Sequence, residues 1–173
     1  HVDLESKNPF KVTASYESWR YKNRDSKGKA NNANSYKWAP QGEIVTFKDS
    51  ISFENNGVQF YHRNREQTVF DVTVKQQKME SVKEQMLNPL ANLTFGGFMT
   101  GDNLKSDGTY LGKYQDTDFK GFNLTSVKPS KKQSLEIYLN TTQSDFSVWN
   151  NGLKSLIASN KNTAKQAEKS TIK

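Results

Sequence analysis

Apolar residues that alternate with polar ones recur along most of the chain, and this alternation limits the fold more than any other feature of the sequence. In the segments Phe10–Tyr16, Thr68–Lys75 and Ser134–Asn140, every second side chain is apolar, which is typical of a strand with one buried face. Turn-forming residues separate such segments at intervals of about 8–12 residues. The pattern predicts about eight to ten short strands in an all-β fold, an antiparallel β-sandwich.

One short helix is expected to interrupt these strands. In Gln77–Leu87, the residues Met79, Val82, Met86 and Leu87 recur at helical spacing, and the Asn88-Pro89 pair ends the segment. We therefore predict a sandwich with one short inserted helix.

Both ends of the chain are expected to be flexible. Residues 1–9 are polar and end in Pro9, so they are interpreted as a flexible lead-in. A single sandwich domain is expected over residues 10–150, with a last strand formed around Phe146, Val148 and Trp149. Residues 151–173 are expected to form a short amphipathic segment and then a polar basic tail.

Composition excludes several kinds of site. The 173 residues contain no cysteine, so disulfides, thiolate metal sites and cysteine nucleophiles are ruled out. His62 is the one histidine inside the chain, and no metal-ligand spacing or Ser/His/Asp pattern can be built around it. We interpret it as a structural or surface histidine, and expect no catalytic residue, no metal and no cofactor.

Charge and aromatic residues point to a binding surface instead. The formal net charge is +7, and basic and aromatic residues gather on either side of a long polar loop predicted at residues 22–35. Aromatic and arginine side chains are the usual anchors of protein interfaces. The candidate ligand-binding residues are Trp19, Arg20, Tyr21, Arg24, Tyr36 and Trp38. The simpler alternative is that Trp19 and Trp38 belong to the core and the cations are solvated neighbours.

Two segments carry a resemblance to a known family. Residues 42–47 (GEIVTF) form an early Gly-Glu turn and strand, and residues 127–139 (VKPSKKQSLEIYL) place a proline turn before a late alternating strand. The arrangement resembles the immunoglobulin-like (telokin-like) accessory domains of Gram-positive secreted proteins and lipoproteins. The resemblance implies an immunoglobulin-like sandwich with an extracytoplasmic, mostly non-enzymatic role, and it brings no catalytic residue with it.

Together these observations predict a non-enzymatic binding or interaction domain of a low-GC bacterium that contacts a protein or cell-envelope ligand. It would be located at the cell surface or outside the cell, and any signal peptide or lipid anchor would precede His1. No apolar run is long enough to span a membrane. The alternative is a basic nucleic-acid-binding β protein, and a carbohydrate-active sandwich is the third possibility.

Overall fold

Two antiparallel sheets face each other, and a long helix covers the outer side of the larger one. The computed structural model of the chain describes residues 1–25, 45–64 and 68–171, with side chains described as far as residue 160. The five-stranded sheet has the spatial order β1 (Val2–Phe10), β10 (Ser130–Gln143), β7 (Leu93–Thr100), β6 (Gly57–Arg63) and β5 (Ser50–Glu54). The three-stranded sheet has the order β2 (Thr13–Ser18), β9 (Thr117–Ser126) and β8 (Leu104–Tyr114).

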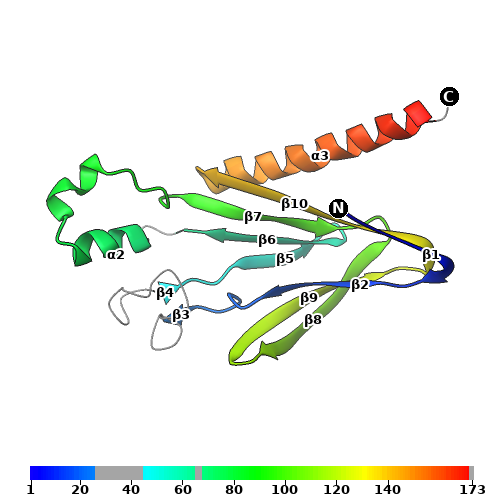
Figure 1. Cartoon of the computed structure of the whole chain (residues 1–173), viewed down its shortest axis with the longest axis horizontal. Helices are drawn as coiled ribbons and strands as arrows, with labels where there is room; N and C mark the ends of the chain where they lie inside the picture. Colours follow the sequence, from blue (N-terminus) through cyan, green and yellow to red (C-terminus); the bar gives the residue numbers. More distant parts are fainter. Residues whose placement is uncertain (26–44, 65–67, 172–173) are drawn as a thin grey trace.

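Shorter elements lie at one end of this arrangement. A two-stranded pair is formed by β3 (Arg24–Asp25) and β4 (Val45–Thr46). Helix α2 (Val69–Gln76) and a 3-10 helix, η1 (Glu80–Gln85), connect β6 to β7. The last element is helix α3 (Phe146–Thr171), which lies along the five-stranded sheet, so the layers are helix, sheet and sheet (Figure 1).

The main core fills the space between the two sheets. The alternation in β9 points Phe122 and Leu124 inward, and they pack with Val58, Phe60 and Met99 from the five-stranded sheet. Leu124 and Val58 are fully buried. The apolar positions that alternate in the sequence are therefore the inner faces of the strands, as expected for a sandwich.

A second, smaller core lies on the other side of the five-stranded sheet. Trp149 and Leu153 are one helical turn apart on α3 and are almost completely buried against Tyr138 of β10. The indole Nε1 of Trp149 donates a hydrogen bond to the carbonyl oxygen of Asn140 at 2.9 Å. The Asn140 side chain in turn donates to the Trp149 carbonyl at 2.8 Å, so these two residues fasten the helix to the strand.

The prediction of an all-β antiparallel sandwich with a short inserted helix is confirmed. The immunoglobulin-like strand connections are a finer expectation, and the observed strand order does not establish them.

The position of the inserted helix differs from the prediction. Residues 68–75, expected as a strand, form α2, because Thr68 and Asp71 make a capping arrangement in which the Thr68 backbone N–H donates to Asp71 Oδ2 at 2.7 Å. Residues 77–87, expected as the helix, contain only η1, and Leu87 is 83% exposed. The apolar residues at helical spacing in this segment therefore do not form the buried face of a helix.

The two ends of the chain also differ from the prediction. Residues 2–10, expected mostly as a lead-in, form β1 and pair with β10 at the edge of the sheet. Residues 146–149, expected as a last strand, begin α3, which continues to Thr171 through the range expected to be a tail. The described ranges contain no helix that combines the length and the apolar character needed to cross a membrane.

Candidate functional site

A buried carboxylate joins three separate parts of the chain at one end of the sandwich. Asp49 Oδ1 accepts hydrogen bonds from Arg20 Nε at 2.8 Å and from His62 Nδ1 at 2.9 Å, and its Oδ2 accepts one from Ser18 Oγ at 3.0 Å. The Asp49 backbone N–H also donates to the Arg20 carbonyl at 2.7 Å. We call Ser18, Arg20, Asp49 and His62 the Asp49 cluster. Because the carboxylate accepts hydrogen bonds from Arg20 and His62, it sets the orientation of the guanidinium and of the imidazole ring.

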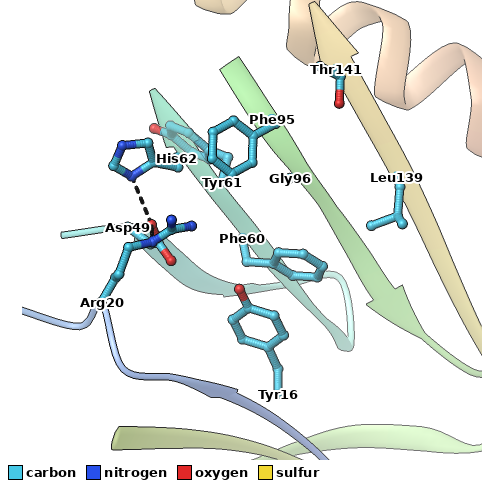
Figure 2. Close-up of a pocket in the computed structure, with 10 residues that line it drawn as sticks. All are labelled: Tyr16, Arg20, Asp49, Phe60, Tyr61, His62, Phe95, Gly96, Leu139 and Thr141. Carbon is cyan, nitrogen blue, oxygen red and sulfur yellow. Dashed lines mark hydrogen bonds and ion pairs between the residues drawn. The ribbon is translucent and has the colours of Figure 1, made fainter. Parts of the chain in front are cut away.

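Three residues of the Asp49 cluster, Arg20, Asp49 and His62, form one wall of a cavity of about 240 Å³ (Figure 2). Aromatic rings form other walls: Tyr16 stacks on Phe60 with ring centroids 4.0 Å apart. Phe95 lies 5.4 Å from the His62 ring and also 5.4 Å from the Arg20 guanidinium carbon. The cavity therefore combines an apolar lining with a small group of oriented polar atoms, as ligand pockets commonly do.

The cavity is open because the two sheets differ in width. Leu135, Ile137 and Leu139 occupy one face of β10, and Leu135 packs into the core between the sheets. Farther along the same face, Ile137 is 46% exposed and Leu139 is 65% exposed. The three-stranded sheet does not cover this part of β10, and Leu139 lies at the cavity.

Tyr16 contributes a hydroxyl that stays protonated. Burial raises the pKa of Tyr16 to about 12, the negative charge of Asp49 acts in the same direction, and Arg20 opposes both. At neutral pH this phenol is therefore a neutral hydrogen-bonding group at the edge of the cavity.

Beside the cavity, an exposed tryptophan contacts two arginines. The guanidinium carbons of Arg20 and Arg24 are 5.6 Å and 5.7 Å from the centre of the Trp19 ring, which is the distance of cation–π contacts. Trp19 itself is 43% exposed. The next aromatic side chain, Tyr21, has the Lys22 ammonium 5.2 Å from its ring centre. We call Trp19, Arg20, Tyr21 and Arg24 the Trp19 surface.

A second hollow lies beside Tyr21 at this end of the molecule. Its volume is about 470 Å³, and its charged lining consists of Lys48 and Lys120 together with Asp49 and Glu54. Asp49 lines both hollows. The Trp19 surface is thus bordered by two depressions that share the buried carboxylate.

The candidate residues are placed as follows. Trp19, Arg20, Tyr21 and Arg24 lie together, with cation–π contacts joining Trp19 to both arginines. The exposure of Trp19 rules out the alternative that it belongs to the core. The other two predicted residues, Tyr36 and Trp38, fall outside the described residues, as does most of the loop predicted at residues 22–35.

Sequence reasoning missed Asp49. The strand neighbours of His62 offer no group that orients its ring, and Asp49 fills that role from 13 residues away in the chain. Asp49 stands in a Lys-Asp-Ser stretch that is typical of an ordinary turn. One sequence feature could have indicated that His62 faces the interior: it lies two residues after Phe60 and four after Val58, which both point inward from β6.

The Arg20 guanidinium at this site can pair with a negatively charged group. Arg20 and His62 are held by one carboxylate at the wall of an apolar cavity, and a carboxylate or phosphate of a ligand is the natural partner of such a guanidinium. Among the residues that the structure describes, no group of three or more His, Asp or Glu is placed to hold a metal ion.

Comparison with known proteins gives a family and no further relative. No curated protein and no solved structure matches the chain. One family model matches residues 1–173, that of the DUF5703 N-terminal domain, which is described as a domain of unknown function (DUF5703). Since the match extends over the full length of the sequence, the chain belongs to the DUF5703 N-terminal domain family.

Proposed function

We propose that this chain is a non-enzymatic binding domain that contacts an anionic protein or cell-envelope ligand through the Trp19 surface. The observation that carries the proposal is the exposed Trp19 ring with guanidinium groups of Arg20 and Arg24 over it. Tryptophan and arginine dominate the energetics of binding interfaces because they combine a large contact area with directional hydrogen bonding.

Arg20 and Arg24 have different roles in the proposed binding. Arg20 is anchored from behind by Asp49, so its guanidinium is already oriented before a ligand arrives. Such preorganisation lowers the entropy lost on binding. Arg24 lies in the short strand β3 and reaches the same tryptophan ring. The guanidinium groups of Arg20 and Arg24 beside the exposed ring are the cations that this proposal assigns to a carboxylate or phosphate of the ligand.

We further propose that the domain acts outside the cytoplasm, as the resemblance to accessory domains of secreted proteins and lipoproteins implies. The absence of cysteine is compatible with export from a low-GC bacterium. Surface proteolysis of intact native cells, followed by mass spectrometry, tests the location. Release of peptides of this chain from intact cells is the expected result, and their appearance only after lysis contradicts it.

The binding test compares wild type with Trp19→Ala and Arg24→Gln, and leaves Arg20 unchanged because its loss would also disturb Asp49. The probes are purified Gram-positive cell walls, the same walls stripped of phosphate-containing polymers, and a set of acidic surface proteins. We expect each substitution to weaken retention by about tenfold or more, with the melting temperature within about 2 °C of wild type.

A matched control removes the same charge elsewhere. Lys131→Gln neutralises one exposed cation on β10, and it is expected to bind like wild type. Equal losses in Lys131→Gln and Arg24→Gln would show that only net charge matters and would overturn the proposal. Tight binding of an oligonucleotide, with log K falling steeply against log salt, would favour the nucleic-acid alternative instead.

A further inference from the structure

The outer face of the three-stranded sheet carries an aromatic cluster that the Trp19 surface does not include. This sheet is the layer farthest from α3, and its outer face is turned away from the rest of the molecule (Figure 1). Tyr110 and Tyr114 from β8 both donate hydrogen bonds across β9 to the carboxylate of Glu17 on β2. Phe119 of β9 lies beneath them and is only 6% exposed.

The rings hold Tyr114 so that its ring is the flat platform of this face. Tyr114 stacks on Phe119 with centroids 4.4 Å apart and an interplanar angle of 24°. One face of the Tyr114 ring is therefore against Phe119, while the residue as a whole remains 60% exposed. Tyr110 meets Phe119 edge-on at 5.8 Å. Three contacting rings and two hydroxyls bound to one carboxylate hold Tyr114 in a fixed orientation.

Two glycines explain why the rings lie so close to the sheet. A Cβ atom on Gly112 would come within 2.2 Å of the Phe119 ring, and one on Gly121 would come within 2.1 Å of the Tyr110 ring. Any other residue at these positions would push the aromatic side chains outward. The sequence thus lets the Phe119 and Tyr110 rings lie close to the sheet by leaving out two side chains beneath them.

Hydroxyl and amide groups extend the platform along the same face. In the register of β2 and β9, Glu17 lies opposite Gly121, and the next two outward pairs are Ser15 with Asn123 and Thr13 with Thr125. Ser15 Oγ donates to Asn123 Oδ1 at 2.6 Å, and the Thr13 and Thr125 hydroxyls are 3.1 Å apart. From Thr13 to Glu17 the strand spans about 14 Å, which exceeds the length of a single sugar ring.

The charge of this face differs sharply from that of the Trp19 surface. Glu17 is the one charged side chain among the outward positions of β2 and β9, which are residues 13, 15, 17, 117, 119, 121, 123 and 125. On β8, Lys105 lies opposite Thr125, at the end of the face away from the rings, and the exposed Asp107 follows it on the same strand. A single cation at one end does not suit a nucleic acid or another polyanion. A flat ring, hydroxyls, the amide of Asn123 and the carboxylate of Glu17 instead suit a neutral ligand rich in hydroxyl groups.

We propose that this outer face binds a neutral oligosaccharide chain, with Tyr114 as the stacking ring and Glu17 as the hydrogen-bond acceptor for sugar hydroxyls. The negative π-face of an aromatic ring attracts the polarised C–H groups of a sugar ring that lies flat on it. The Glu17 carboxylate has acceptor capacity beyond its two tyrosine partners, because its two oxygens offer about four lone-pair positions. Asn123 and the hydroxyl rows continue the contacts along the chain of sugars.

Affinity electrophoresis tests this site directly. The protein is basic, with a sequence pI of about 9.4, so it is run toward the cathode at neutral pH. The gels contain a soluble neutral polysaccharide: xyloglucan, galactomannan, xylan, laminarin, pullulan or levan in turn. We expect at least one of these to retard wild type, with an affinity about tenfold or more weaker in Tyr114→Ala. Tyr114→Phe keeps the ring and is expected to stay within about threefold of wild type, as the stacking contact predicts.

Two controls separate binding at this platform from binding elsewhere on the molecule. Leu111→Ala changes a residue on the same strand that is 71% exposed but belongs to the opposite face, and it is expected to bind like wild type. Trp19→Ala is also expected to retain polysaccharide binding, so a failure of the Trp19 proposal leaves this test intact.

The proposal is overturned if no polysaccharide retards wild type, or if Tyr114→Ala and wild type are retarded equally. In either case the tyrosines and Glu17 serve only to tie β8 to β2. A purely structural tie predicts a lower melting temperature for Tyr114→Phe and Tyr114→Ala alike, without any saccharide dependence.

Discussion

Replacement of Asp49 measures how strongly the Asp49 cluster holds the open end of the sandwich. The carboxylate side chain is 4% exposed, while those of its partners Arg20 and His62 are 26% and 12% exposed. In Asp49→Asn, the remaining carbonyl oxygen can still accept from Arg20 and His62, and the new amide can donate to the Ser18 hydroxyl. The change therefore removes the negative charge of the carboxylate and leaves the geometry almost unchanged.

The expected change in the free energy of unfolding follows from the type of hydrogen bond that is altered. A hydrogen bond to a charged group contributes about 1.5–3 kcal/mol, compared with about 0.5–1.5 kcal/mol for a neutral pair. Loss of charge assistance in the bonds with His62 and Ser18 predicts that Asp49→Asn lowers the free energy of unfolding by about 2 kcal/mol, since the Arg20 guanidinium stays charged. Asp49→Ala leaves both nitrogen partners without their acceptor, and the expected loss is about 3–5 kcal/mol.

Urea unfolding followed by tryptophan fluorescence gives these differences, provided that the m-values agree. Asp3→Asn is the matched control, because the side chain of Asp3 is 74% exposed and its expected change is within about 0.5 kcal/mol. The reasoning fails if Asp49→Asn is no more destabilised than Asp3→Asn, or if Asn and Ala at position 49 have equal effects.

Two further predictions concern other parts of the molecule. Burial and the negative charge of Asp49 raise the pKa of Tyr16 to about 12, although Arg20 acts in the opposite direction. The folded state therefore keeps a proton on this phenol that the unfolded chain loses near the ordinary pKa of 10.0. Stability contributed by this difference is complete below about pH 10 and is lost as the pH rises toward 12. Spectrophotometric titration at alkaline pH, with Tyr16→Phe subtracted, should show a late-titrating phenol, and a difference spectrum that titrates at the ordinary value would contradict this. For the helix layer, Trp149→Ala is expected to cost about 3–5 kcal/mol in the free energy of unfolding, because it empties a fully buried position and removes the donor to Asn140; a cost below about 1 kcal/mol would mean that α3 does not depend on this contact.

The alternation of apolar residues was sufficient to predict the sheets. In β9 and β10, Phe122, Leu124 and Leu135 occupy every second position and pack between the layers. Strand periodicity can be read from the sequence because it records which side of a local element is buried. The antiparallel sandwich and the position of most strands followed from that relation alone.

The helices could not be assigned in the same way. The alternation of Phe70, Val72 and Val74 predicts a strand, yet the capping contact between Thr68 and Asp71 and the surrounding packing produce a helix. In α3, the three apolar residues nearest the start of the helix were ambiguous between strand and helix because a short segment fits both periods. The helix is favoured because it buries Trp149 and Leu153 together against the outer face of the five-stranded sheet.

For the candidate site, the sequence alone determined that aromatic and basic residues are concentrated around Trp19, because neighbours in the chain are necessarily neighbours in space. Only the tertiary structure decided that Trp19 is exposed and that Arg20 is held by a buried carboxylate. Asp49 lies 29 residues from Arg20 and 13 from His62, and no local pattern encodes that meeting. The same holds for Glu17 and the tyrosines of β8, which are brought together across 93 and 97 residues of chain. Contacts of this kind depend on strand order and register, which are set by the packing of the whole sandwich rather than by any single segment.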